Sequence, residues 1–337
     1  MDYVQKLKSE MEEHRIETEY IELCTKYARR LCDNNMPVIF DFKHLSLLVG
    51  LEAEELAYYL FVDDDEFYST VEISKRSGGY RIIDIPSERL KNVQRWILKN
   101  VLKNVQIHDS CIGFREGKSI YDNAAYHTNK ACVLNMDLKD FFPSIKQKDV
   151  FLAFYKLGYT KKIAYYLSKL LTKNGQLPQG SPASPMISNM VAFRLDNRLD
   201  KLAESFGACY TRYADDLTFS GDRSIINMIP IINTIVLNEN FFVNSKKTRY
   251  AYANQHQEVT GLTVNEKVSV SKEYLRNFKK EIYFCKKFGV TSHLKKTNNH
   301  KSFFKEYMYG KAYFVNMIDR EDGKKLLGEL DSIEWDY

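Results

Sequence analysis

The spacing of hydrophobic and polar residues changes along the chain, and it predicts a mixture of helices and short strands. Charged residues alternate with Leu, Ile and Tyr at helical spacing over 1–32 and 43–60. Residues 67–85 alternate around a Ser-Gly-Gly turn, as the two strands of a hairpin do. Residues 131–136 form an apolar run, which is typical of a buried strand.

The remaining pattern is mainly helical, with one irregular loop. Three prolines and a glycine within 177–185 are incompatible with regular structure there, and a helical pattern follows from Ser188. The other expected elements are helices over 88–104, 147–172 and 224–240, short strands over 241–262, and mostly helix from about residue 268. This succession predicts an α+β fold.

The composition is that of a globular chain, with 337 residues and 44% hydrophobic residues, enough for two or three subdomains. No apolar run reaches the length of a membrane span, and the first residues lack the apolar core of a signal peptide. The 6 scattered cysteines include no Cys-x-x-Cys pair, which argues against a zinc site or a disulfide framework. We therefore expect a cytoplasmic protein that does not bind membranes.

The net charge of +5 conceals a strong asymmetry. Residues 1–66 carry a net charge of −9 and residues 319–337 carry −4, so residues 67–318 carry +18. Within 269–311, 11 bases stand against 3 acids, and aromatic residues are interleaved with the bases. This pattern suits a surface that follows a nucleic-acid duplex, although a solvated helix face above a core stripe is the alternative. The bases that we assign to RNA binding are Arg276, Lys279, Lys280, Lys286 and Lys287.

Candidate chemistry is concentrated in a pair of adjacent aspartates. Asp215 and Asp216 lie at a tight turn, in the sequence Tyr-Ala-Asp-Asp, between two strand-like runs. Adjacent carboxylates repel each other unless a cation joins them, and Mg²⁺ and Mn²⁺ prefer carboxylate oxygens. A metal site is one interpretation, and a solvated hairpin turn is the other, because such turns also favour Asp.

Asp137 adds a third carboxylate, at the end of the apolar run 131–136. An unpaired carboxylate is costly to bury, so packing alone does not explain an aspartate in this position. Three carboxylates on two strands are the minimum needed to hold two Mg²⁺ ions for in-line phosphoryl transfer. We interpret the acidic run Asp63–Glu66 as a solvated linker and leave it out of the site.

Three ordered motifs resemble the palm motifs of reverse transcriptases. They are Asp137-x-x-x-Phe-Phe, then Leu177-Pro-Gln-Gly-x-Pro-x-Ser-Pro, then the Tyr213-Ala-Asp-Asp turn, at spacings similar to those of that family. The resemblance implies a right-hand polymerase architecture. Its expected parts are an acidic helical segment over 1–66, fingers and palm over 67–262, and a basic thumb with an acidic tail over 263–337.

Two short signatures resemble those of bacterial retron reverse transcriptases in particular. Asn123-Ala-Ala-Tyr-His127 is similar to the signature that precedes the first catalytic aspartate, and Val259-Thr-Gly is similar to the one that follows the palm. The stretches 73–86 and 113–119 also resemble the finger region of that family. By itself, His127 fits a hydrogen-bonded structural histidine at least as well.

The resemblance implies roles for individual residues around the carboxylates. Asp137, Asp215 and Asp216, with the backbone carbonyl of Leu138, would bind two Mg²⁺ ions, for which Mn²⁺ is a possible substitute. Phe142 matches the aromatic steric gate that excludes a ribose 2′-hydroxyl. Lys247 resembles the lysine that protonates the leaving pyrophosphate, with Lys246 as the alternative, and Asp215 is expected to tolerate change less well than Asp216.

The resemblance also implies contacts to nucleotide and RNA. Gln179 and Gly180 match a loop at the incoming nucleotide. Lys75 and Arg81 match finger residues that hold the triphosphate, although a solvated turn lysine fits Lys75 nearly as well. The residues expected to contact the cognate RNA or its branch point are Asn123, His127, Val259, Thr260 and Gly261.

The expected activity is RNA-directed DNA synthesis from dNTPs. For a retron enzyme, the resemblance implies priming from a guanosine 2′-hydroxyl of a partner non-coding RNA, which leaves branched RNA–DNA (msDNA). It further implies a separate effector protein in anti-phage defence, and a cellular RNase H that removes the template RNA. The alternatives are another bacterial reverse transcriptase, of the group II intron or another defence type, and a non-catalytic RNA-binding module. Phe142 disfavours an RNA-dependent RNA polymerase.

Overall fold

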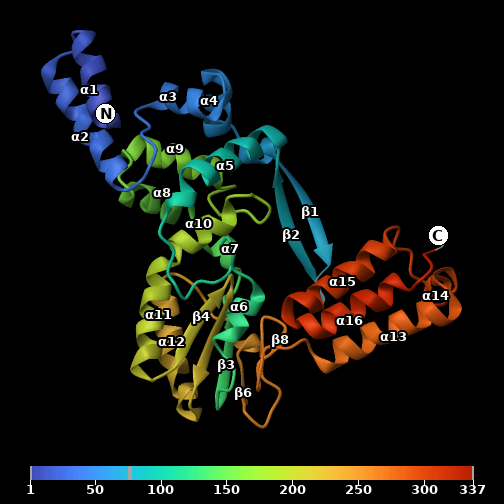
Figure 1. Cartoon of the computed structure of the whole chain (residues 1–337). Helices are drawn as coiled ribbons and strands as arrows, with labels where there is room; N and C mark the ends of the chain where they lie inside the picture. Colours follow the sequence, from blue (N-terminus) through green and yellow to red (C-terminus); the bar gives the residue numbers. More distant parts are fainter. Residues whose placement is uncertain (1, 75–77, 336–337) are drawn as a thin grey trace. The chain divides into compact units, whose positions relative to one another are not determined.

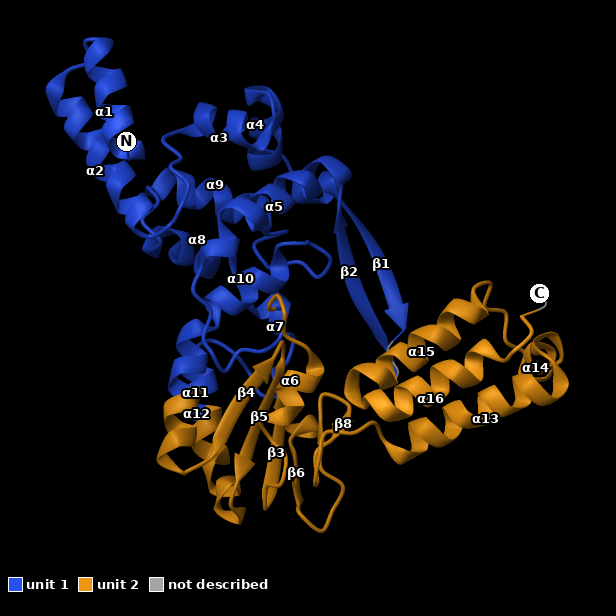
Figure 2. Cartoon of the chain, viewed as in Figure 1, with its two compact units in different colours: residues 1–114, 138–198, 234–243 blue, residues 115–137, 199–233, 244–337 orange. Residues whose placement is uncertain are grey.

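The computed structural model describes residues 2–74 and 78–335 of the chain (Figure 1). These residues form two compact units (Figure 2). Unit 1 contains the chain up to residue 114 together with 138–198 and 234–243, and unit 2 contains 115–137, 199–233 and the chain from residue 244. The division into three parts that the sequence suggests stays a prediction. In the described part of the chain, no helix is long and apolar enough to cross a membrane.

Unit 1 begins with two pairs of helices where the sequence predicts two helical stretches. The first pair is α1 (Tyr3–Glu13) and α2 (Thr18–Asp33), and the second is α3 (Phe42–Val49) and α4 (Ala53–Phe61). Arg15 has a φ of 54° at the first break. At the second break Gly50 ends α3 with a φ of 72°, a left-handed conformation that glycine adopts without strain.

The acidic run Asp63–Glu66 is solvated at Asp63, Asp65 and Glu66, as predicted, but Asp64 corrects the prediction because it is buried. Residues Asp64–Phe67 form the short 3₁₀ helix η1, in which Asp64 is only 5% exposed. The ammonium of Lys169 lies 3.0 Å from the Asp64 carboxylate, and the backbone N–H of Asn174 donates to it at 2.8 Å. A partner cation and a backbone donor compensate the burial of this carboxylate, neither of which a run of acids reveals in the sequence.

The predicted hairpin is formed by β1 (Tyr68–Ser74) and β2 (Tyr80–Pro86), which pair antiparallel from Tyr68↔Pro86 to Ser74↔Tyr80. The other helices that lie wholly in unit 1 are α5 (Glu88–Asn100), η2 (Leu102–Asn104), α7 (Phe141–Ser144), α8 (Gln147–Lys156), α9 (Lys161–Leu171) and α10 (Ser184–Val191). The loop 177–185 is shorter than predicted, because α10 already begins at Ser184. Pro185 fits the first turn of a helix, where its missing N–H has no partner to lose.

The centre of unit 2 is a four-stranded antiparallel sheet in the order β4-β5-β3-β6. Its strands are β3 (Cys132–Asp137), β4 (Cys209–Tyr213), β5 (Asp216–Gly221) and β6 (Arg249–Tyr252). Strand β3 is the predicted apolar run, and it is buried because β5 and β6 flank it on both sides. The helix η3 (Arg223–Met228) contacts β3 and β5, and the helices α11 (Phe193–Ser205) and α12 (Ile229–Asn238) lie partly in this unit.

The rest of unit 2 is a small hairpin and a group of helices. Helix α6 (Ile120–Ala125) packs against β4 and β8, and η4 (Ser245–Lys247) precedes β6. The hairpin pairs β7 (Glu258–Val259) with β8 (Leu262–Thr263). The predicted C-terminal helical region consists of α13 (Lys272–Phe288), α14 (Val290–Lys296), α15 (Phe304–Ile318) and α16 (Arg320–Asp331). A Cβ added at Gly323 would lie 2.2 Å from Cα of Asn316, so α15 and α16 approach closely only because residue 323 is glycine.

Candidate active site

The adjacent aspartates lie at the turn of the hairpin β4–β5, as the sequence predicts. Tyr213 pairs with Asp216, so Ala214 and Asp215 alone form the turn. Ala214 has a φ of 57°, a conformation that a residue with a side chain adopts only at a cost. We call β4, β5 and this turn the catalytic hairpin.

The sheet register brings the third aspartate to the same place. Asp137 ends β3 directly opposite Asp216 on the neighbouring antiparallel strand. Side chains of directly opposed residues lie on one face of a sheet with Cβ atoms about 5 Å apart. The structure therefore brings Asp137, Asp215 and Asp216 together at one end of the sheet.

The Asp137 side chain is 9% exposed and is held by two residues around η4. Lys247 Nζ lies 2.6 Å from one carboxylate oxygen, and Asn244 Nδ2 donates to the other at 3.2 Å. The backbone N–H of Asn244 also donates to the carbonyl of Asp137 at 2.7 Å. Of the two candidate lysines, Lys247 is the one that reaches the carboxylates. Its pKa is raised, first because of the hydrogen bond to Asp137, so it remains an ammonium ion.

The three carboxylates are electrostatically crowded. The pKa of Asp216 is raised to about 6, first by desolvation at the strand end, and then by the negative charges of Asp215 and Asp137. Neighbouring negative charges favour the binding of a cation between them. In this structure the Lys247 ammonium supplies a positive charge at Asp137.

The three aspartates are suited to bind a divalent ion whose coordination is completed by the phosphates of the substrate. Among the described residues, no three Asp, Glu, His or Cys side chains form a ready-made metal cage. Mg²⁺ in phosphate-handling sites is held by one or two carboxylates, with water and substrate phosphates completing its coordination shell. Asp137 and Asp215 can supply those carboxylates. Leu138, whose carbonyl the resemblance adds to the shell, is buried beside Val243 in an isolated β-bridge.

The residues predicted to contact the nucleotide lie in unit 1. Phe142, in α7, is half-buried, and its ring centroid lies 6.2 Å from that of Phe114 and 5.6 Å from that of Phe141. Phe141 is buried, as expected for a core residue. Arg81 is exposed on β2, and Lys75 lies outside the described residues.

The loop that contains Gln179 and Gly180 lies against β2. The carbonyl of Gln179 accepts the backbone N–H of Asp84 at 2.6 Å. Gly180 has a φ of 121°, and a Cβ at this position would lie 2.4 Å from the carbonyl oxygen of Asp84. The loop is therefore fixed against β2, and only glycine fits at position 180.

The two short signatures lie side by side, but most of their side chains are buried. Asn123, His127 and Val259 are each 0% exposed, so direct RNA contact by these three side chains does not fit this structure. The imidazole of His127 lies between the hydroxyls of Thr211 and Ser220, at 2.7 Å from each. Within residues 2–74 and 78–335, the side-chain amide of Asn123 has no hydrogen-bond partner. The structural alternative for His127 is thus the better interpretation.

Thr260 and Gly261 form the turn of the hairpin β7–β8, with φ values of 47° and 82°. A positive φ is rare for a β-branched residue such as Thr260. Its hydroxyl donates to the carbonyl of Ile120 at 3.4 Å, which ties this turn to the start of α6. Gly261 is exposed and Thr260 is half-buried, so the turn itself remains a candidate for RNA contact.

The basic residues of α13 form one exposed stripe. Bases recur at helical spacing on the side opposite the buried Phe278, Ile282 and Cys285. The exposed bases of the stripe are Lys272, Arg276, Lys279, Lys280, Lys286 and Lys287. Lys311, by contrast, has a structural role, because its ammonium pairs with Glu281 and lies 4.6 Å from the ring centroid of Phe278.

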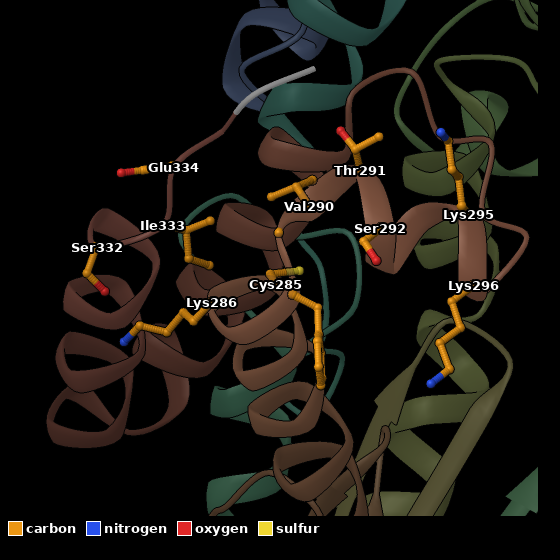
Figure 3. A pocket seen from close by; sticks show the side chains of 12 residues that line it. Cys285, Lys286, Val290, Thr291, Ser292, Lys295, Lys296, Ser332, Ile333 and Glu334 are labelled. Atoms are coloured by element: carbon orange, nitrogen blue, oxygen red, sulfur yellow. The ribbon is translucent and has the colours of Figure 1, made fainter.

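A cavity of about 1080 Å³ opens at the end of this helix. Its lining includes Lys286, Lys295 and Lys296 from α13 and α14, and Ser332 and Glu334 from the chain after α16 (Figure 3). The lysine side chains point in different directions rather than toward one centre (Figure 3). Asp137, Asp215 and Asp216 are not among the lining residues, so this cavity is not the site of the carboxylate chemistry.

Two residues around the carboxylates were not found from the sequence. Asn244 positions Asp137, but an Asn before a lysine pair carries no signal of that contact. Arg212 is fully buried in β4, and its guanidinium donates to the carbonyl of Ala214 at 3.1 Å. An arginine within a strand next to the Asp-Asp pair is a signal that could have been followed, because a buried arginine needs partners.

The comparisons with known proteins define the class of this chain. The family model described as "Reverse transcriptase (RNA-dependent DNA polymerase)" matches residues 73–302, so the chain belongs to the reverse transcriptase family. Within that family it is a bacterial retron reverse transcriptase. It is 31% identical over 314 residues to "Retron Ec86 reverse transcriptase" of Escherichia coli, a match that covers 91% of this chain and 94% of that protein. It is 32% identical over 340 residues to "Retron Mx162 reverse transcriptase" of Myxococcus xanthus, covering 89% and 68%.

The similarity to solved structures concerns the fold. An apo telomerase from Candida tropicalis matches with a TM-score of 0.51 and 12% identity, covering 95% of this chain and 64% of the telomerase chain. Together with the family match, this shows the right-hand polymerase fold of mixed helices and antiparallel sheet. The protein is an RNA-directed DNA polymerase of retron type, and its family implies dependence on divalent metal ions and an RNA template.

Proposed function

We propose that the protein uses two Mg²⁺ ions, held by Asp137 and Asp215 with help from Asp216, to extend a primer on its cognate non-coding RNA. The single observation that carries this proposal is the convergence of these carboxylates at the paired ends of β3 and β5. When bound, the ions would activate the attacking hydroxyl and stabilise the leaving pyrophosphate. The protein contributes mainly position and charge, as phosphoryl transfer requires.

Lys247 is the proposed proton donor to the pyrophosphate. Its ammonium lies 2.6 Å from Asp137 and its side chain is 58% exposed, so it can leave the carboxylate without leaving the site. Its raised pKa keeps a proton available at neutral pH. A carboxylate that binds a metal ion no longer needs this partner, and the lysine is then free to donate.

The proposed nucleotide contacts are in unit 1. Phe142 would press on the 2′ position of an incoming sugar and select dNTPs. Gln179 and Gly180, fixed against β2, would contact the nucleotide, and Arg81 would hold its triphosphate with its two-pronged guanidinium. Lys75 is proposed for the triphosphate on sequence grounds alone.

The exposed stripe of α13 is the proposed duplex-binding surface, since neutralised phosphates release counterions and favour binding. The Thr260–Gly261 turn is the proposed contact for the cognate RNA. We further propose that a guanosine 2′-hydroxyl of that RNA primes synthesis to give msDNA, that a cellular RNase H trims the template, and that a separate effector protein completes an anti-phage system. This part of the proposal rests on the retron class of the relatives alone.

The test is to express the protein with the non-coding RNA encoded beside it and to analyse the nucleic acids on a denaturing gel. A branched RNA–DNA species should form with the wild type, collapse in length after RNase treatment, and vanish in Asp215→Asn. Its absence, or its persistence in that variant, would refute the proposal. Competition between dNTPs and rNTPs, with Phe142→Val as the comparison, tests the sugar selection.

A further inference from the structure

The proposed chemistry gives no role to a set of three buried, hydrogen-bonded side chains at the catalytic hairpin: His127, Thr211 and Ser220. His127 lies in the turn after α6, and its backbone N–H donates to the carbonyl of Ala124 at 3.0 Å. Its Nε2 lies 2.7 Å from Oγ1 of Thr211 in β4, and its Nδ1 lies 2.7 Å from Oγ of Ser220 in β5. One imidazole therefore joins α6 to both strands that carry the Asp-Asp turn.

The protonation state of this imidazole decides which hydrogen bonds it can form with Thr211 and Ser220. Burial, with a smaller effect from Lys130, lowers the pKa of His127 to about 3, so the ring is neutral at any working pH. A neutral imidazole has one N–H donor and one acceptor nitrogen, and hydroxyls can satisfy both. Thr211 and Ser220 are 1% and 0% exposed, so water cannot replace either partner without opening the hairpin.

The catalytic hairpin needs such support because its turn is unfavourable in isolation. Ala214 holds a positive φ of 57°, and the turn brings Asp215 and Asp216 toward Asp137. Arg212 holds the turn from within, through its bond to the carbonyl of Ala214. His127, which is not part of the sheet, is hydrogen-bonded to Thr211 before the turn and to Ser220 after it.

We infer that His127 is a positioning residue of the polymerase centre, which fixes the catalytic hairpin against α6, and that its part in the retron signature is not contact with RNA. This inference rests on the proposed function of the carboxylates. It differs from a plain core role, because the two strands that His127 joins are the strands that present Asp215 and Asp216. Helix α6 is itself tied to the β7–β8 turn by Thr260.

The test separates chemistry from RNA binding. His127→Phe keeps a planar aromatic ring, slightly larger than imidazole, and removes both hydrogen bonds, and Thr211→Val removes one partner with little change in shape. Each full-length variant is assayed for single-dNTP incorporation on an unrelated primed RNA, for affinity to the cognate RNA, and for thermal unfolding. Thr172→Val is the matched control, because Thr172 is buried (1% exposed) and its hydroxyl donates to the carbonyl of Ser168 in the preceding helix α9.

The expected result is a fall in kcat of about tenfold or more in His127→Phe and Thr211→Val, with KM for dNTP and cognate RNA affinity within about twofold of the wild type. The double variant should lose little more than His127→Phe alone, because both changes remove the same contact. Thr172→Val should lower the unfolding temperature and leave kcat unchanged. If His127→Phe does not fold, Thr211→Val and Ser220→Ala carry the same test.

Two results would overturn the inference. One is weakened binding of cognate RNA with normal incorporation on the unrelated template, which would make His127 an RNA contact. The other is a lowered unfolding temperature with unchanged kcat, as in the control, which would make it an ordinary core residue. Failure of the wild type to incorporate dNTP on any template would instead refute the proposed function.

Discussion

The ion pair between Lys247 and Asp137 leads to an unusual prediction, in which one substitution improves metal binding and impairs catalysis. Lys247→Met removes the ammonium 2.6 Å from Asp137 and keeps the length of the side chain. A hydrogen bond between charged groups contributes about 1.5–3 kcal/mol when it is shielded from water. Lys247 is 58% exposed, and solvent screening reduces the expected contribution to about 1 kcal/mol.

That value sets the expected change in Mg²⁺ affinity. In the wild type Asp137 must leave Lys247 before it binds a cation, so Lys247 competes with Mg²⁺ for this carboxylate. Removing the Lys247–Asp137 interaction, which contributes about 1 kcal/mol, should lower the Mg²⁺ concentration for half-saturation about fivefold. The value of kcat should fall about a hundredfold or more, because the proton donor is lost.

The assay combines two measurements on the same protein. Thermal unfolding across a Mg²⁺ titration, without nucleotide, reports metal binding, and single-dNTP incorporation at saturating Mg²⁺ reports kcat. Lys246→Met is the control and should change neither quantity. The reasoning is refuted if the half-saturating Mg²⁺ concentration of Lys247→Met stays equal to or rises above that of the wild type.

The pH dependence of this pair has a definite sign. The folded-state pKa of Lys247 is raised above 10.5, first because of its hydrogen bond to Asp137. Its contribution to stability is therefore fully present below pH 10.5 and is lost as the pH rises through the raised pKa. Lys247→Met should consequently lower the unfolding temperature at neutral pH in the absence of Mg²⁺, and this difference should shrink at strongly alkaline pH.

Three further predictions concern the nucleotide and the duplex. Phe142→Val should lower the preference for dNTP over rNTP by about 10–200-fold, measured as the ratio of kcat/KM values. Gly180→Ala should raise KM for dNTP and destabilise the fold by about 1–3 kcal/mol, because its Cβ would lie 2.4 Å from the carbonyl of Asp84. Lys279→Gln should reduce the salt dependence of RNA affinity by about one counterion, whereas Lys311→Gln, which removes the partner of Glu281, should not.

The positions of the three proposed catalytic carboxylates in the fold could be predicted from the sequence because their signals are local. The apolar run before Asp137 is the buried strand β3, and the Asp-Asp pair lies at a two-residue turn. Most helices also follow from their periodicity. Their ends differ from the prediction where local chemistry decides, as at Gly50, which ends α3 in a left-handed conformation.

The contacts that could not be predicted depend on partners distant in sequence. Asp64 looks solvated in the sequence and is buried, because Lys169 lies beside it in the fold. The signature that contains Asn123 and His127 suggests contact with RNA, but both side chains are enclosed because α6 packs on the sheet. The choice of Lys247 over Lys246 depends on the orientation of η4, which the sequence of two adjacent lysines does not specify.

The proposed role of Asp215 in metal-dependent DNA synthesis is tested by single-nucleotide incorporation with Asp215→Asn, a substitution that keeps the shape of the side chain and removes its charge. The purified full chain is given a primed RNA template, one dNTP and Mg²⁺, with Asp222→Asn, at the far end of the catalytic hairpin, as the control. We expect a loss of about a hundredfold or more in kcat for Asp215→Asn, a smaller loss for Asp216→Asn, and none for the control. Wild-type kcat in Asp215→Asn, with Mg²⁺ still required, would contradict the proposed role.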